Sequence, residues 1–208
     1  MHTNMNFPAP IAVLGFLAVT SGSIVACLSI LVALFLKRKP AATWIAKISL
    51  AAIALYAALL LAFSLASKET ALSAGEEKYF CEIDCHLAYS VVNTQWTGPT
   101  TFVVTLRTRF DETTTSPTRP KEVPLQPNSR VIHLADADGI NYPLIATQGT
   151  PLTQSLKPGE FYTTQLFFEA PASLHSPRLS LTSEGWQETL IIGSENSPLH
   201  KKTYFRLS

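Results

Sequence analysis

Two long apolar runs near the start of the chain constrain its fold more than any other feature. The first extends from Ile11 to Leu36 and carries no charge, and the second, from Trp44 to Ser67, carries only Lys47. As a helix the first run would be about 39 Å long, which exceeds the roughly 30 Å hydrocarbon core of a bilayer. Lys47 stands near one end of its run, where its ammonium can reach the interface. Residues 11–67 are therefore predicted to form a transmembrane helical hairpin, with helices at 11–36 and 44–67.

The basic residues around the connection between the two runs predict the orientation of the hairpin. Lys37, Arg38, Lys39 and Lys47 cluster there, whereas residues 1–10 contain no Lys or Arg. Short loops rich in Lys and Arg stay on the cytoplasmic side of a membrane. We therefore expect a short extracytoplasmic N-terminus and an extracytoplasmic chain beyond the hairpin. A cleaved signal peptide is not favoured, because a basic leading region is missing and the first run is too long.

Small residues recur at every fourth position in both runs and form a narrow ridge on each helix. Such residues allow helix backbones to approach closely. We expect the two ridges to pack on each other within the hairpin, and packing against a separate membrane protein is the alternative. The residues concerned are Ala18, Gly22 and Ala26 in the first run and Ala54, Ala58, Ala62 and Ala66 in the second.

The composition changes after Ser67. Residues 68–78 are polar and are predicted to be a linker, and residues 79–208 consist of short segments rich in Thr, Val, Phe and Tyr. Apolar and polar residues alternate in "TFVVTLRTRF", as in a half-buried strand. Turn sequences such as "DADG" and "KPGE" separate the segments. An antiparallel, immunoglobulin-like β-sandwich is predicted over 79–208. The expected strands are 87–95, 101–110, 130–135, 141–146, 160–169, 178–183, 188–193 and 202–207.

Three stretches in succession carry a resemblance to a known family. These are "DADGINYPL", "LKPGEFYTTQLFFEAP" and "RLSLTSEG". In this order they resemble the telokin-like, immunoglobulin-like domains found in exported bacterial proteins, in which a turn containing "PGE" opens a strand that ends near a proline. The resemblance covers residues 79–208. It implies an extracytoplasmic β-sandwich tethered to a bacterial membrane, and it carries over no catalytic residue.

Charge and motifs exclude several functions for the β region. From Glu76 onward there are 14 acidic and 11 basic residues without a basic stripe, so no nucleic-acid partner is expected. The chain contains no nucleophile elbow, phosphate-binding glycine loop or HExxH motif, and we do not expect an enzyme.

The stretch "CEIDCH" places two cysteines and a histidine close together. Cys81 and Cys85 are expected to form a disulfide, since exported thiols are readily oxidised. Cα atoms four apart in a strand are about 13 Å from each other, so the segment must curl to close the bridge. The alternatives are a copper or zinc site formed by Cys81, Cys85 and His86, or free, redox-active thiols.

The order of the parts also resembles cytochrome oxidase subunit II, in which two membrane spans precede an exported β domain. A C-x-x-x-C pair binds copper in that family, near the end of the chain and with a His and a Met following. Here the pair precedes the β domain, and Met1 and Met5 are the only methionines. This departure is why no resident cofactor is expected in the favoured interpretation.

Two classes of function follow from the sequence. The favoured class is a binding or scaffolding module of the bacterial cytoplasmic membrane, whose β-sandwich or proline-rich segment 111–129 contacts an envelope protein. The alternative is a metal-handling or redox subunit that uses Cys81, Cys85 and His86. In both classes the lipid bilayer is a partner of the helices.

The orientation of the hairpin is open to a direct test. Topology reporters fused at Ser208 and at Pro40 are expected to report opposite sides of the membrane, because the basic cluster retains the connection inside. Activity of an export-dependent and of a cytoplasm-dependent reporter at each site measures this. Equal signals at the two sites would contradict the predicted hairpin.

Overall fold

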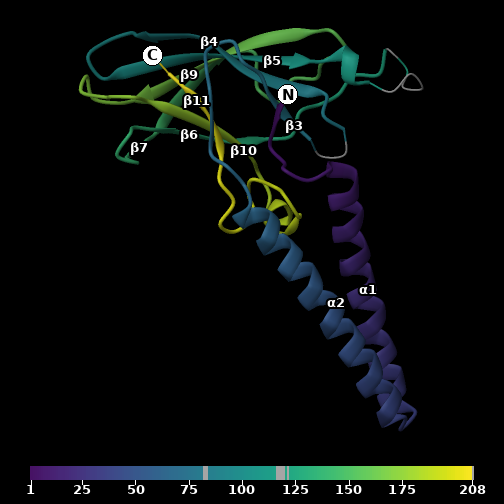
Figure 1. Ribbon diagram of the computed structural model, residues 1–208. Coiled ribbons are helices and arrows are strands. Elements are labelled where there is room, and N and C mark those ends of the chain that lie inside the picture. The colour runs from purple at the N-terminus through teal and green to yellow at the C-terminus, as the bar shows by residue number, and fades with distance from the viewer. Residues whose placement is uncertain (82–83, 116–119, 121, 208) are drawn as a thin grey trace.

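The protein consists of a helical hairpin and a two-sheet β-sandwich (Figure 1). The computed structural model describes residues 1–81, 84–115, 120 and 122–207. Helices α1 (Ala9–Phe35) and α2 (Lys39–Leu65) lie antiparallel, and both are long and apolar enough to cross a membrane. The predicted fold class, a two-helix hairpin followed by an all-β sandwich, is confirmed.

Proline sets the starts of both helices. Each helix has a proline at its first or second position. A backbone N–H at these positions would have no intrahelical acceptor, so proline loses no hydrogen bond there. This explains why α2 begins at Lys39, several residues before the apolar run at Trp44. Between the helices, Lys37 adopts a φ of 56° in a tight connection, so the basic cluster lies at the hairpin tip.

The packing between the helices differs from the predicted contact of two small-residue ridges. Ala18 and Gly22 are exposed but line a groove shared with α2, whereas the exposed Ala54, Ala58, Ala62 and Ala66 do not line it. Ala58 and Ala62 each stand two positions from the buried Leu60, which at 3.6 residues per turn places them on the opposite side of α2. The less exposed residues of α2 mostly follow one another at steps of three, four or seven: Ala42, Ile45, Ser49, Tyr56, Leu60, Phe63 and Ser64.

The sandwich is formed by a six-stranded and a five-stranded sheet. The strand orders are β1-β3-β4-β5-β9-β8 and β2-β11-β10-β6-β7, and every pairing is antiparallel except β1 with β3 and β2 with β11. The strands of the first sheet are β1 (His2–Thr3), β3 (Lys78–Phe80), β4 (Leu87–Trp96), β5 (Thr101–Phe110), β8 (Leu144–Gly149) and β9 (Phe161–Glu169). Those of the second are β2 (Thr70–Leu72), β6 (Arg130–Ala135), β7 (Asn141–Tyr142), β10 (Arg178–Ser183) and β11 (Thr203–Arg206).

The core lies between the two sheets. Alternate residues of β5 and β9 pair across the first sheet, as Phe102 does with Phe168 and Val104 with Leu166, and all four are buried. Leu179 and Leu181 of β10 and Phe205 of β11 face them from the second sheet, in one buried apolar cluster. The period of two in the sequence therefore corresponds to the inward faces of both sheets.

Three segments differ from their sequence-based prediction. The strand predicted at 141–146 is divided between β7 and β8, which belong to different sheets. The linker predicted at 68–78 is partly incorporated into the sandwich, because β2 pairs with β11 and Lys78 begins β3. The strand predicted at 188–193 is absent from the described chain, where the 3₁₀ helix η2 (Trp186–Leu190) occupies its first part. Within segment 111–129, a second 3₁₀ helix, η1 (Glu112–Thr114), is present, and residues 116–119 and 121 lie outside the described residues.

The sequence predicts that a fragment starting near Ala74 folds without the helices, but the structure assigns β2 to that fold. A fragment that starts at Lys68 keeps β2, and its free energy of unfolding is expected to exceed that of the Ala74 fragment by about 2–3 kcal/mol. The reason is the side chain of Leu72, which is 1% exposed between the sheets. Urea unfolding of both fragments, with Leu72→Ala in the longer one as the matched variant, measures the difference. Equal stabilities would show that β2 contributes nothing to the core.

Candidate functional site

The cysteine pair forms a disulfide. Cys81 and Cys85 are bridged with Cα atoms 4.1 Å apart, so the chain curls directly after β3 as the sequence analysis expects for a bridge. His86 is 4% exposed, and its ring lies within hydrogen-bond distance of Thr114 Oγ1 (2.8 Å) and Asp84 Oδ2 (3.1 Å). Because both sulfurs are bonded to each other and both ring nitrogens have polar partners, the three residues do not present the thiolates that copper or zinc would bind. Among the described residues there is no group of three His, Cys, Asp or Glu side chains arranged to hold a metal.

A charged cluster lies across β3 and β5 near this bridge. Arg109 donates two hydrogen bonds to Glu77, at 2.8 and 2.7 Å, and a third to Asp111 at 3.2 Å. The Tyr79 hydroxyl donates to Asp111 Oδ2 at 2.6 Å. The bidentate geometry is the strong form of a pair between arginine and a carboxylate.

These contacts lower the pKa of both carboxyl groups. For Glu77, the hydrogen bond from Arg109 is the main cause. For Asp111, burial alone would raise the pKa, but hydrogen bonds from Tyr79, Thr113 and Arg109 outweigh burial and hold the pKa well below its ordinary value. Burial, together with these carboxylates, raises the pKa of Tyr79, which therefore remains a hydrogen-bond donor.

The first residues of the chain lie between β3 and the loop that joins β10 to β11, which we call the β10–β11 loop (residues 184–202). Asn4 N–H donates to the Tyr79 carbonyl at 3.0 Å, and its side-chain oxygen accepts from the Cys81 N–H at 2.8 Å. On the other side, the Asn4 carbonyl accepts from the Glu195 N–H at 2.9 Å. Asn4 is 1% exposed. One asparagine thus connects the disulfide-bearing strand to the β10–β11 loop.

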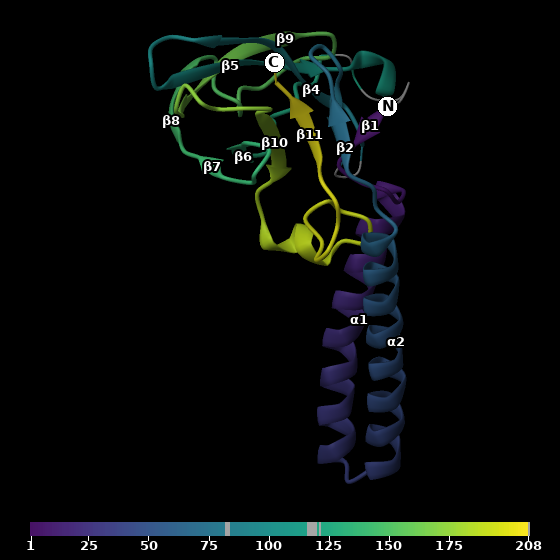
Figure 2. The same ribbon diagram turned by 60° about the vertical axis from the view of Figure 1, so that its left-hand side comes forward.

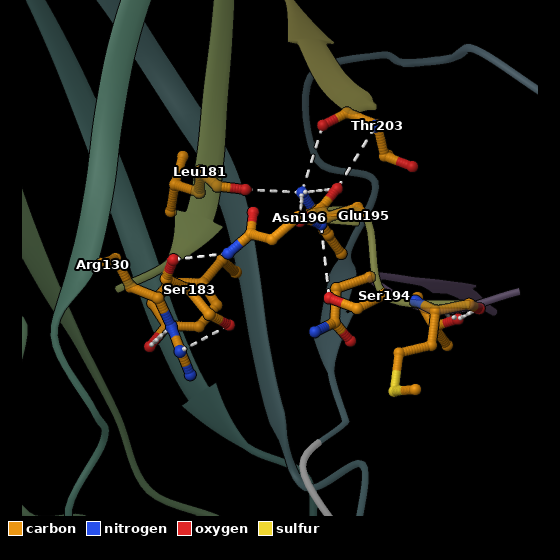
Figure 3. A network of polar contacts seen from close by, with 12 residues as sticks. Arg130, Leu181, Ser183, Ser194, Glu195, Asn196 and Thr203 are labelled. Atoms are coloured by element: carbon orange, nitrogen blue, oxygen red, sulfur yellow. Dashed lines mark hydrogen bonds and ion pairs between the residues drawn. The ribbon is translucent and has the colours of Figure 1, made fainter. Parts of the chain in front are cut away.

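The centre of this region is a buried ion pair between Lys78 and Glu195. Lys78 Nζ contacts both carboxylate oxygens of Glu195, at 2.6 and 2.8 Å, and also donates to the carbonyls of Leu181 and Thr203. Figure 3 shows Leu181, Glu195 and Thr203 converging from the second sheet and the β10–β11 loop. The side chains of Lys78 and Glu195 are 0% and 3% exposed. Because Lys78 belongs to the first sheet, its ammonium joins both sheets.

Burial shifts the pKa of both partners toward their neutral forms. It lowers the pKa of Lys78 and raises that of Glu195, and the attraction between the two charges opposes both shifts. A buried charge pair is stable only where hydrogen bonds satisfy the remaining polar atoms. The Leu181 and Thr203 carbonyls satisfy the ammonium in this way, and the Thr203 N–H approaches the carboxylate at 3.4 Å.

The hairpin contacts the same region directly. Asn6 N–H donates to the Gly193 carbonyl, and the Asn6 side chain donates to the Phe63 carbonyl of α2 at 2.8 Å. The rings of Phe7 and Phe63 meet edge to face at 4.6 Å. The Lys201 N–H donates to Ser67 Oγ at 2.7 Å, just beyond the end of α2. The end of α2 is therefore joined to the sandwich at several points, and α1 follows directly from the attached residues 6 and 7. We call this region the junction. It consists of residues 2–7, β3, the β10–β11 loop, the start of α1 and the end of α2.

Only part of the junction is recognisable from the sequence. Cys81, Cys85 and His86 stand out there, and the structure brings them to one edge of the junction. No motif marks Asn4, Lys78, Glu195 or Gly193, which carry most of the contacts. Lys78 stood in an expected linker and Glu195 between two expected strands, and no spacing in the sequence relates two residues so far apart.

Comparison with known proteins gives a structural likeness without a sequence family. No family model and no curated protein sequence matches the chain. The β part resembles MPT63. The 1.5 Å crystal structure of MPT63, a secreted protein from Mycobacterium tuberculosis, matches with a TM-score of 0.42 and 12% identity over 67% of this chain and 98% of that chain. The telokin-like resemblance stays a prediction.

Removing the buried ammonium tests the ion pair. Lys78→Met is expected to lower the free energy of unfolding by about 3–5 kcal/mol, because Glu195 would remain buried without its counter-charge. The double variant Lys78→Met/Glu195→Leu removes both charges and should recover much of the loss. Thermal and denaturant unfolding of the three proteins measures this. A double variant no more stable than Lys78→Met would contradict the assignment.

The Arg109 cluster predicts a dependence of stability on pH. The pKa of Glu77 is lower in the folded protein than in the unfolded chain, so its contribution is present above about pH 4.3 and is lost as the pH falls. Glu77→Gln should therefore lower the free energy of unfolding by about 1–3 kcal/mol at pH 7, and the deficit should narrow below pH 4. Denaturant unfolding from pH 7 to pH 3 measures it, with Glu184→Gln at an exposed position as control. A deficit that does not change with pH would exclude this cause.

Proposed function

We propose that this protein is a membrane-anchored, non-catalytic module of the bacterial envelope. In this proposal the hairpin spans the cytoplasmic membrane and holds the β-sandwich on the extracytoplasmic side, where the sandwich binds or positions an envelope protein. The length and apolar character of both helices and the basic hairpin tip support the anchoring part.

The observation that carries the binding or scaffolding part is the number of contacts at the junction. A flexible tether needs only a linker, and the sandwich would then adopt many orientations. Here the first strand of the chain and β2 belong to the sheets, and Asn6, Phe7 and Ser67 are bonded or packed across the junction. A sandwich held in one orientation above the bilayer suits a module that positions a partner.

The open edge of the first sheet supports a protein partner. β8 is the last strand of its sheet, and all six of its residues are exposed. An edge strand carries backbone groups that a strand of another protein can pair with. Leu144 and Ile145 add exposed apolar surface to this edge.

The metal-handling or redox alternative has less support. It needs thiolates at Cys81 and Cys85, and the disulfide removes them. The binding or scaffolding role is therefore the function that the geometry supports best.

A distance measurement between hairpin and sandwich tests the proposal. A nitroxide on the exposed Cys27 of α1 and a second on Thr97→Cys, in the turn between β4 and β5, report the position of the sandwich relative to the helices. For the protein in lipid vesicles we expect one narrow distance distribution. A broad distribution would show a freely swinging sandwich and would contradict a scaffolding role.

Two glycines provide a matched pair of variants for the same measurement. Gly193 has a φ of +78°, and a Cβ there would lie 2.6 Å from the Phe7 Cβ and 2.9 Å from the Phe7 N. Gly193→Ala should therefore separate residues 2–7 from the β10–β11 loop and broaden the distribution. Gly98→Ala adds the same methyl group where no atom lies within 4 Å, and the distribution should stay narrow. Equal widths in both variants would show that the junction does not fix the orientation.

A further inference from the structure

The β10–β11 loop lies at the end of the sandwich that faces the hairpin. Figures 1 and 2 both show this segment, in yellow-green to yellow, beside the upper ends of α1 and α2. Its 3₁₀ helix η2 is attached to the hairpin, because the Tyr56 hydroxyl donates to the Leu190 carbonyl at 2.7 Å. The loop therefore has a defined height along α2.

The point on α2 where the loop is attached lies near the outer edge of the hydrocarbon core of a bilayer. At 1.5 Å per residue, Tyr56 lies about 26 Å along α2 from Lys39, and the hydrocarbon core is about 30 Å thick. With the basic hairpin tip at the inner headgroups, Tyr56 stands just inside the outer edge. The Leu190 carbonyl is separated from this point of α2 by the Tyr56 side chain and one hydrogen bond.

The loop exposes three large apolar side chains. Trp186 and Leu199 are each 67% exposed, and Leu190 is 43% exposed. Single exposed apolar residues are common on protein surfaces, but three on one loop beside a membrane helix form a surface suited to lipid. Tryptophan in particular is enriched at the membrane interface, where its ring is apolar and its N–H meets water.

Basic residues accompany this surface. Lys201 and Lys202 belong to the loop and Lys68 follows α2, and all three are exposed. The hydrogen bond from the Lys201 N–H to Ser67 Oγ places these charges next to the end of the helix. Exposed lysines at the level of anionic headgroups add favourable electrostatic attraction.

We propose that the β10–β11 loop is a second membrane contact, in which Trp186, Leu190 and Leu199 enter the interface of the outer leaflet. The partner is the bilayer itself. The inference rests on the proposed function to the extent that the hairpin must span the membrane. It adds that the sandwich meets the lipid directly and does not stand clear of it.

The three tryptophans of the chain allow a test with internal controls. Trp44 lies in α2, Trp186 in η2 and Trp96 at the end of β4, whose turn to β5 lies away from the hairpin in both views. Three variants of the full chain each retain one tryptophan and carry phenylalanine at the other two. They are reconstituted in phosphatidylcholine–phosphatidylglycerol vesicles that contain lipid with a nitroxide high on the acyl chain.

We expect fluorescence from Trp186 to be quenched several-fold more strongly than fluorescence from Trp96. Trp44 should be quenched as well if the hairpin spans the bilayer. Quenching of Trp44 without quenching of Trp186 would overturn the loop contact and leave the proposed anchoring intact, and would indicate a loop free for a protein partner. No quenching of Trp44 would instead refute the anchoring on which the inference rests.

A second measurement keeps all three tryptophans, in case their removal disturbs folding. Leu199→Cys in a Cys27→Ser background carries an environment-sensitive fluorophore, and Thr97→Cys in the same background is the matched control. The label at residue 199 should report an apolar environment in vesicles, and the label at residue 97 an aqueous one. Aqueous signals at both positions would contradict the proposal.

Discussion

The buried ion pair of the Lys78 ammonium with Glu195 is the interaction on which the rest of the architecture depends. The ammonium comes from β3 of the first sheet and is neutralised by Glu195 from the β10–β11 loop, while carbonyls of β10 and β11 complete its hydrogen bonds. Withdrawing a lysine so completely from water is unfavourable unless every donor is satisfied. The two sheets and the loop are therefore held in one relative position at the end of the sandwich nearest the hairpin.

The relative position of the two sheets and the β10–β11 loop also determines where the hairpin can attach. Glu195 also donates its N–H to Asn4, and Asn4 holds the Cys81 N–H on the opposite side. The disulfide after β3 keeps that turn closed, and Gly193 allows Phe7 to approach the loop closely. The ion pair, the asparagine and the glycine thus form a continuous set of contacts from the core of the sandwich to the ends of the helices.

The sequence predicted those parts of the molecule in which a local pattern matches the local structure. The apolar runs predicted both helices, and the strands 130–135 and 178–183 have the predicted bounds, because alternation within six residues is enough to identify them. The disulfide was also accessible, since both cysteines lie within one turn.

The parts that were missed depend on partners distant in sequence. β1 has only two residues, and its pairing with β3 spans the whole hairpin, so no periodicity marks it. The apolar "ETLIIG" resembles a strand, but its first part is helical beside α2 and Ile191 and Ile192 are buried without strand pairing. Small-residue spacing identified a ridge on α2 without showing which side is buried, and the less exposed side of α2 contains Tyr56, Leu60 and Ser64 instead.

The two parallel pairings impose an order of assembly on the chain. β1 emerges before the hairpin and β3 after it, so β1 can pair only when both helices are in place and its segment is on the same side as β3. β2 likewise waits for β11, beyond all the other strands. Contacts so distant in sequence form slowly, and until they form the sheets keep unpaired edges. Formation of the helical hairpin is thus a step in the folding of the sandwich, because a chain in which only one of the two helices crossed a membrane would hold β1 and β3 on opposite sides of it.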